Sequence, residues 1–269
     1  MTGRPILIDA HAHLDHYGDN LDTALAEIES HRILTVAVSM DPESYERVSE
    51  IARRCPLVIP ALGVHPWNAP HYANRLDELS PLIAESPMIG EIGLDFHFVK
   101  DPSCRPAQRK VFDFFLAAAR RQNLIVNLHT KGAEREVLEM LANHDVGRAI
   151  VHWYSGPIGA MSGYFDRGCL FTVGVEILVS DRIRRIAARI PAGLLLTETD
   201  NPGGYEWYTK EPGRPSLITK VIEKLAEARK TAPEAIKETV HDNFARVVGR
   251  NERLRPWAVL VGPGSAGNP

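Results

Sequence analysis

Eight short runs of branched apolar residues alternate with helix-like segments along most of this 269-residue chain. The runs lie near residues 6–10, 33–39, 57–63, 87–93, 124–128, 148–152, 169–175 and 193–198. They are rich in Val, Ile and Leu, without regular alternation with polar residues, which is typical of strands buried on both faces. Strands that alternate with helices predict a parallel sheet with right-handed crossovers, and eight strands are enough to close an α/β barrel of the (β/α)8, or TIM, type.

The segments between these runs have the spacing of amphipathic helices. They cover residues 21–30, 42–54, 107–122, 133–143, 158–165, 181–189 and 216–229, and a further helix over about 233–248 is expected to pack outside the barrel. We therefore predict a single barrel domain over residues 1–249. Residues 250–269 form a C-terminal tail, and we expect its Gly- and Pro-rich last eight residues to be disordered.

The tail also contains a short apolar segment, Trp257-Ala258-Val259-Leu260-Val261. One interpretation is a strand that docks on a protein partner. The more common alternative is a cover for apolar surface of its own domain. Both interpretations stay open from the sequence.

Composition excludes several classes of protein. With a net charge of −3, no global positive field attracts nucleic acid, so a polyanion must be held by local cations or by metal ions. The three cysteines are far apart and show no CxxC spacing, which argues against a zinc finger or a disulfide framework. No apolar stretch approaches the roughly 18 residues of a membrane helix, and the chain runs directly into its first strand. We expect a cytoplasmic protein without membrane contact.

Five of the apolar runs end in side chains that bind metal ions. These side chains are His11, His13, Glu91, His129, His152 and Asp200. A single His-x-His pair is weak evidence, and any one apolar run that ends in His is more often a core histidine. Core packing gives no reason for five strands to end in ligand types. The joint pattern therefore predicts one metal site at the carboxyl-terminal face of the barrel.

The order of the strands predicts how these ligands divide. Residues i and i+2 of a strand point to the same side, so His11 and His13 reach one ion. Strands one and eight are neighbours in a closed barrel, so Asp200 joins them. His129 and His152, from strands five and six, are expected to hold a second ion.

Glu91, from strand four, is placed to bridge the two ions with its two oxygens. Two ions about 3.5–4 Å apart suit hydrolysis of a phosphate ester. Asp200 is then the expected general base for the attacking water, so Glu91 and Asp200 are the predicted catalytic residues. A mixed imidazole and carboxylate shell favours Zn, Mn, Fe or Co over Ca, while Mg prefers oxygen ligands but stays open. We predict two divalent ions, either Zn, Mn or Mg.

A set of motifs in fixed order carries a family resemblance. The motifs are Asp9-Ala10-His11-Ala12-His13, Gly63-Val64-His65-Pro66, Gly90-Glu91-Ile92-Gly93-Leu94-Asp95, Gln108-Arg109, Leu128-His129-Thr130-Lys131, His152-Trp153-Tyr154-Ser155-Gly156, Glu198-Thr199-Asp200 and Asn243-Phe244. In this order the chain resembles the TatD-like metal-dependent deoxyribonucleases of the amidohydrolase superfamily, from about residue 6 to residue 248.

The resemblance implies a metal-dependent barrel that hydrolyses DNA phosphodiesters, often as a 3′–5′ exonuclease on single-stranded DNA. Some relatives are instead assigned to the removal of D-amino acids from tRNA. By motif matching, the six metal ligands carry over to this chain, and His65 carries over as a contact to the substrate phosphate. Asp95 is expected either to orient His65 or a metal ligand, or simply to form a turn.

The chain departs from the family pattern around the expected substrate site. Lys131 stands where the family usually has Arg, and Trp153 and Tyr154 replace a Cys-Phe pair. Asn201 begins a segment that replaces the usual Pro-Tyr-Leu. With His65, these four residues are the candidate substrate contacts, and the departures leave the substrate preference open. Family members with divergent rims also occur in anti-phage defence operons, which makes such a role one expectation for this chain.

Aromatic residues are frequent in the segments expected around the mouth of the barrel, namely Trp153, Tyr154, Tyr205, Trp207 and Tyr208. Beside the cations Lys131, Lys210 and Arg214 they either stack unpaired bases, worth about 1–3 kcal/mol per base, or form a hydrophobic lid. Single-stranded DNA or another nucleic-acid end is the predicted substrate. The alternatives are a tRNA-ester or small-molecule hydrolase on the same scaffold, and a subunit that docks on a partner through its tail.

Overall fold

The computed structural model describes residues 6–147, 149–249 and 251–262. Its centre is one sheet of eight parallel strands in sequence order. The strands are β1 (Leu7–Ala12), β2 (Ile33–Val38), β3 (Val58–Leu62), β4 (Met88–Gly93), β5 (Val126–His129), β6 (Ala149–Val151), β7 (Leu170–Val173) and β8 (Leu195–Thr197). The predicted eight-stranded parallel sheet is confirmed.

The two outer strands of this sheet meet and nearly close the barrel. The Thr197 hydroxyl of β8 donates to the carbonyl oxygen of Ile8 in β1 at 2.6 Å. Just beyond, the Asp200 N–H donates to the carbonyl oxygen of His11 at 2.9 Å. These bonds bring the end of β8 beside the end of β1, as the sequence predicts, and they place Asp200 next to His11.

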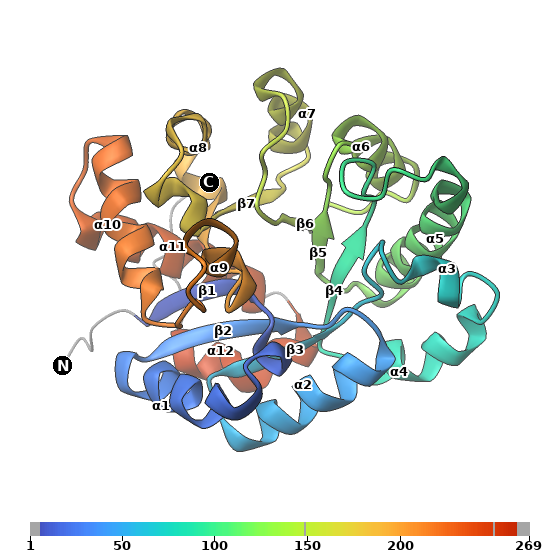
Figure 1. Ribbon diagram of the computed structural model, residues 1–269, viewed down its shortest axis with the longest axis horizontal. Helices are drawn as coiled ribbons and strands as arrows, with labels where there is room; N and C mark the ends of the chain where they lie inside the picture. The colour runs from blue at the N-terminus through green and yellow to red at the C-terminus, as the bar shows by residue number, and fades with distance from the viewer. Residues whose placement is uncertain (1–5, 148, 250, 263–269) are drawn as a thin grey trace.

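Helices surround the strands, as Figure 1 shows. They are α1 (Leu21–His31), α2 (Pro42–Arg54), α3 (Ala69–Tyr72), α4 (Leu79–Glu85), α5 (Arg105–Gln122), α6 (Glu134–Asn143), α7 (Met161–Asp166), α8 (Asp181–Ala187), α9 (Gly203–Thr209), α10 (Leu217–Arg229), α11 (Pro233–Val248) and α12 (Arg255–Val261). The predicted helices are present with boundaries shifted by a few residues. The short helices α3, α4 and α9 were not expected, because α3 and α4 contain Pro and α9 begins with two Gly, residues that lower helix propensity. Among the described helices, none is both long and apolar enough to cross a membrane.

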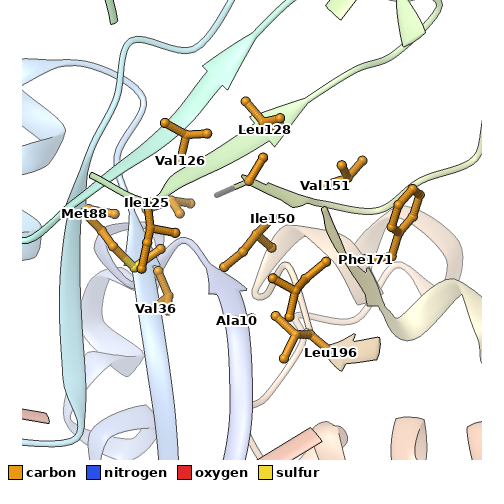
Figure 2. Close-up of a cluster of buried hydrophobic side chains, with 14 of the residues drawn as sticks. Ala10, Val36, Met88, Ile125, Val126, Leu128, Ile150, Val151, Phe171 and Leu196 are labelled. Atoms are coloured by element: carbon orange, nitrogen blue, oxygen red, sulfur yellow. The ribbon is translucent and has the colours of Figure 1, made fainter. Parts of the chain in front are cut away.

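The hydrophobic core lies mainly between the sheet and the helices. Val126 and Leu128 of β5 and Val151 of β6 belong to it, and Figure 2 shows them among side chains from several other strands. Successive residues of a strand point to opposite sides, so Asn127 and His129 of β5 point away from this layer. Packing against the helices thus holds the strands in place. The side of a strand that faces away from the helices can then present polar side chains, as β5 does with Asn127 and His129.

The C-terminal segment covers the barrel on the side of β3. The indole N–H of Trp257 in α12 donates to the carbonyl oxygen of Val58 at 3.1 Å, and Val261 is buried. Arg253 donates to the carbonyl oxygens of Ile83 and Ser86 at 2.8 and 2.9 Å. Of the two interpretations of residues 257–261, the cover for the chain's own domain is confirmed, and the segment is a helix rather than a strand. The disorder expected for the last eight residues falls mostly on 263–269, which lie outside the described residues.

Candidate metal centre

Four side chains at the ends of β1, β4 and β8 point their ligand atoms at one spot. His11 Nε2 lies 3.4 Å from His13 Nε2, and Asp200 Oδ1 lies 3.3 and 3.4 Å from these two nitrogens. Glu91 Oε2 lies 3.6 and 3.5 Å from the same two nitrogens. Four ligands held at about 2.1 Å around a tetrahedral ion are about 3.4 Å apart. These donor atoms therefore fit one divalent metal ion.

Three imidazole nitrogens surround the other oxygen of Glu91. Glu91 Oε1 lies 2.7 Å from His129 Nδ1, 3.1 Å from His152 Nε2 and 3.6 Å from His65 Nε2. His65 Nε2 is also 3.3 Å from His129 Nδ1. The two oxygens of one buried carboxylate thus face two separate groups of imidazoles. This is the arrangement that a bridging ligand between two ions needs.

The buried carboxylates and imidazoles of the site shift one another's pKa values. Burial by itself raises the pKa of the Glu91 carboxyl, but the imidazoles of His65, His152 and His11 hold that pKa well below its ordinary value. Burial likewise lowers the pKa of His13, but hydrogen bonds with Asp200 and Glu91 outweigh it and raise the pKa to about 10. The cavity therefore holds anionic carboxylates that need compensating positive charge. Divalent cations supply such charge, and the mixed nitrogen and oxygen donors suit Zn or Mn.

Three further polar side chains orient the rings that face this centre. Asn127 Oδ1 lies 2.9 Å from His11 Nδ1, so with Nε2 turned to the centre the ring donates its Nδ1 proton to Asn127. Glu198 Oε2 lies 3.3 Å from His152 Nδ1, in the same relation. Such partners fix the ring orientation and raise the basicity of the ligand nitrogen.

Asp95 performs this task for His129. Its Oδ2 lies 3.0 Å from His129 Nε2, which confirms the expectation that Asp95 orients His65 or a ligand. Asn127 and Glu198 were not anticipated from the sequence, although each stands two residues before a predicted ligand, His129 or Asp200. Because residues i and i+2 of a strand share a side, this spacing was the signal that could have found them.

Two glycines allow the backbone to approach the centre closely. A Cβ on Gly63, after β3, would lie 2.3 Å from the backbone nitrogen and oxygen of Glu91. A Cβ on Gly204, in α9, would lie 2.6 Å from the carbonyl oxygen of Thr199 and 3.1 Å from Trp153. Only glycine fits at either point, and so β3 can support Glu91 while α9 lies directly over Asp200.

A pocket of about 310 Å³ opens above these donors. Of the predicted substrate contacts, His65, Lys131 and Trp153 line it. Lys131 Nζ donates to Ser155 Oγ at 2.7 Å and lies 5.3 Å from the centre of the Trp153 ring. This part of the predicted rim is therefore assembled at the mouth of the pocket.

Tyr154 and Asn201 do not lie where a substrate contact must lie. The Tyr154 ring packs 5.3 Å from Phe171 in the core, and its hydroxyl donates to the carbonyl oxygen of Pro157 at 2.7 Å. Asn201 is buried, and its amide donates to the carbonyl oxygen of Arg214 at 2.8 Å. Both polar groups are satisfied inside the protein, so these two residues stabilise loops at the rim, and the predicted contact role is corrected.

The predicted cations are also distributed differently. Arg214 forms an ion pair with Glu27, and Lys210 Nζ donates to the carbonyl oxygen of Trp207 at 3.3 Å. Neither lines the metal pocket. Trp207 and Tyr208 do line it, together with Trp67 and Phe98, which the sequence did not single out. The available signal was position, since Trp67 and Phe98 follow strands β3 and β4 at the end of the barrel where sites form.

Comparison with known proteins identifies the family. A family model described as TatD related DNase matches residues 8–249. The chain belongs to this family. Human deoxyribonuclease TATDN3 is 27% identical over 268 residues, which cover 92% of this chain and 96% of that protein. The uncharacterized metal-dependent hydrolase YabD of Bacillus subtilis is 26% identical over 257 residues, covering 90% and 98%.

Solved structures agree with the family assignment. The TatD homologue YjjV of Escherichia coli superposes with a TM-score of 0.81 at 25% identity, over 90% of this chain and 97% of that chain. The phosphotriesterase homology protein of the same organism, at a TM-score of 0.65 and 14% identity, shares the fold. The protein is thus a metal-dependent hydrolase of the TatD family with an eight-stranded α/β barrel, as the sequence predicted.

Proposed function

We propose that this protein is a deoxyribonuclease that uses two divalent ions, Zn, Mn or Mg, to remove nucleotides from the 3′ ends of single-stranded DNA. The observation that supports it best is the placement of Glu91, whose two oxygens face two different groups of metal-binding donors at the base of one pocket. The deoxyribonuclease name of the human relative agrees with this proposal. When bound, the ions would supply Lewis-acid chemistry that activates a water molecule and stabilises charge on the phosphate.

Residues of the chain supply the proton transfer and the contacts to the phosphate. Asp200 is the candidate general base, because it lines the pocket as an ionised carboxylate. Burial by itself raises the pKa of Asp200, but hydrogen bonds with His11 and His13 outweigh burial and hold this pKa far below its ordinary value. The oxygen of water bonds to phosphorus while the bond between phosphorus and the 3′ oxygen breaks. The departing 3′ oxygen takes up a proton, and the products are a nucleoside 5′-phosphate and a shortened strand.

His65 and Lys131 are placed to hold the phosphate. Burial lowers the pKa of His65 to about 4, so its ring is neutral at pH 7. Its Nδ1 accepts the backbone N–H of Trp67 at 3.3 Å, which leaves the proton on Nε2, toward the pocket. A neutral Nε2–H donor and the ammonium group of Lys131 are the groups that phosphate oxygens need.

The proposal is tested with single-stranded DNA labelled at its 5′ end, in Mg or Mn, with wild type and Asp200→Asn compared. We expect stepwise shortening from the 3′ end by the wild type. Loss of the general base is expected to slow it by about 10²–10⁴-fold. A phosphorothioate cap on the 3′ end should protect the strand, whereas a cap on the 5′ end should not. No cleavage by metal-loaded wild type would contradict the proposal.

A second candidate is a hydrolase of aminoacyl-tRNA esters or of small molecules on the same site. One observation favours it: among the described residues that line the pocket, Lys131 is the only Lys or Arg. Release of a D-amino acid from charged tRNA, with no shortening of DNA, would support this candidate. The anti-phage expectation is separate, and protection of cells from phage by wild type but not by Asp200→Asn would support it.

A further inference from the structure

Four exposed aromatic side chains gather at the mouth of the metal pocket and take no part in the hydrolysis described above. They are Trp67 at 49%, Phe98 at 44%, Trp207 at 64% and Tyr208 at 38% exposure. Within the described ranges, the other exposed large hydrophobic side chains are aliphatic and lie away from this pocket. Exposed aromatic surface gathered at one site marks a place that a ligand covers.

Three of these rings form a continuous chain across the mouth. Phe98 and Trp207 meet edge to face, with ring centres 5.9 Å apart, and Trp67 meets Phe98 at 6.1 Å. Phe98 follows β4, and Trp207 lies in α9 after β8. Strands four positions apart in an eight-stranded barrel stand on opposite sides of it. The contact between Phe98 and Trp207 therefore spans the mouth, and we call Trp67, Phe98 and Trp207 the aromatic bar.

The aromatic bar is tied to the metal centre through Asp95. Asp95 Oδ2 accepts the indole N–H of Trp67 at 2.7 Å and lies 3.0 Å from His129 Nε2. Asp95 Oδ1 accepts the backbone N–H groups of His97 and Phe98 at 2.9 and 2.7 Å. One buried carboxylate thus fixes two members of the bar relative to a candidate metal ligand, so the bar lies at a set distance from the reacting phosphate.

A second aromatic wall limits the size of the pocket. The rings of Trp153 and Tyr208 are 6.2 Å apart, and the Trp153 indole N–H donates to Glu176 Oε2 at 2.5 Å. Glu176 belongs to the short turn Val175–Leu178 after β7. The volume of about 310 Å³ between the walls is near the lower limit for small-ligand pockets, which run from about 300 to 1,000 Å³. This space suits one nucleotide unit.

We infer that the aromatic bar restricts the enzyme to free ends of single strands. When an internal bond is cut, a DNA segment extends from the scissile phosphate on each side. The bar crosses the mouth through which the second of these two arms would have to pass. A terminal nucleotide has only one arm. Its unpaired base enters under the bar and stacks on the exposed rings. This inference rests on the proposed deoxyribonuclease function.

The test compares linear single-stranded DNA with a covalently closed circle of the same sequence, in Mn. We expect the wild type to degrade the linear strand at least 100-fold faster than it opens the circle. Phe98→Ala and Trp207→Ala remove the contact that spans the mouth, and we expect the ratio to fall below about 10. Trp207→Phe keeps a ring in place and should keep most of the discrimination.

Base stacking on the bar is measured with linear strands whose last nucleotide lacks its base. The wild type is expected to process this end about 10-fold or more slowly than a normal end. In Trp207→Ala the two ends should be processed at similar rates. Val259→Ala, an exposed position of α12 remote from the pocket, is the matched control and should behave as wild type.

The outcomes separate the two proposals. If the wild type cuts neither linear nor circular DNA, the deoxyribonuclease function fails. If the wild type cuts both at similar rates, the deoxyribonuclease activity stands, but its restriction to ends and the inference about the bar are overturned. The inference is also overturned if both alanine variants shorten linear DNA normally and still leave the circle intact.

Discussion

At the scale of single residues, the candidate metal centre depends on side chains that orient the candidate ligands without pointing at the centre themselves. Asn127 is buried and is itself fixed by its Nδ2, which donates to the Ala10 carbonyl oxygen at 2.8 Å, while its Oδ1 faces His11 Nδ1 at 2.9 Å and orients that ring. Removal of such a partner leaves a ligand ring free to rotate or to change tautomer. The affinity of the site for metal is therefore set partly by residues behind the ligands.

We predict that Asn127→Leu weakens binding of Mn or Zn by about 10–100-fold, because Leu has similar size but offers no acceptor to His11. Titration of the metal-free protein with Mn, followed by the magnetic resonance signal of the free ion, measures this affinity. Asn143→Leu, at the exposed end of α6, is the matched control and should bind as wild type. Unchanged affinity in Asn127→Leu would show that Asn127 does not orient His11.

Single residues also differ in how well the sequence predicts their position. His11, His13 and Asp200 could be anticipated because strand ends and ligand chemistry are both visible in a sequence. Tyr154 could not be placed, because the direction of a side chain in a turn depends on backbone angles. The preceding residue, Trp153, has a φ of 38°, and the chain turns there so that Trp153 faces the pocket while Tyr154 returns to the core.

At the scale of elements, each helix stabilises the strands through one buried face. In α5, Phe115 is fully buried, while its neighbour Phe114 is only partly buried. Consecutive residues of a helix are rotated by about 100° from each other, so one faces the sheet and the next lies at the edge of the contact. The strands can keep their ligand-bearing ends in register only while such faces remain packed.

We predict that Phe115→Ala lowers the free energy of unfolding by about 3–5 kcal/mol, because it leaves a cavity next to the sheet. Phe114→Ala is the matched control on the same helix and should cost clearly less. Equilibrium unfolding in urea measures both. An equal loss for the two variants would contradict the assignment of the buried face of α5.

Elements differ in how far a sequence predicts them. The strands and the long helices such as α5 and α10 were predictable, because hydrophobic period and length agree over many residues. Helix α9 was not, because it begins with two glycines and is stabilised by its place over Asp200, where Gly204 N donates to the carbonyl oxygen of Asp200 at 2.6 Å. The position of α9 is a tertiary effect, and so is the aromatic bar that depends on it.

At the scale of the whole molecule, the scarcity of positive charge at the site distinguishes this protein from one that binds a long nucleic acid along a basic groove. The net charge is −3, and Lys131 is the one Lys or Arg that reaches the metal pocket among its described lining residues. Binding of a strand along a basic groove releases many counterions. Capture of a single terminal nucleotide releases few.

We therefore predict a shallow dependence of kcat/KM on salt. Each phosphate that is neutralised on a single strand contributes a slope of about −0.7 to a plot of the logarithm of affinity against the logarithm of salt concentration. We expect a slope of about −0.7 to −1.4 between 50 and 200 mM KCl, as one or two contacts give. Lys131→Met should make the slope shallower by about 0.7. A slope steeper than about −3 would indicate an extended DNA-binding surface instead.

A bridging role of Glu91 between two metal sites fixes the number of divalent ions bound per chain, and this number can be measured. Metal analysis of protein equilibrated with Zn or Mn should find two ions in the wild type. Glu91→Gln removes the charge and one of the two ligand oxygens, and we expect it to retain fewer than one ion. Asn143→Leu should retain two. One ion in both the wild type and Glu91→Gln would contradict the account.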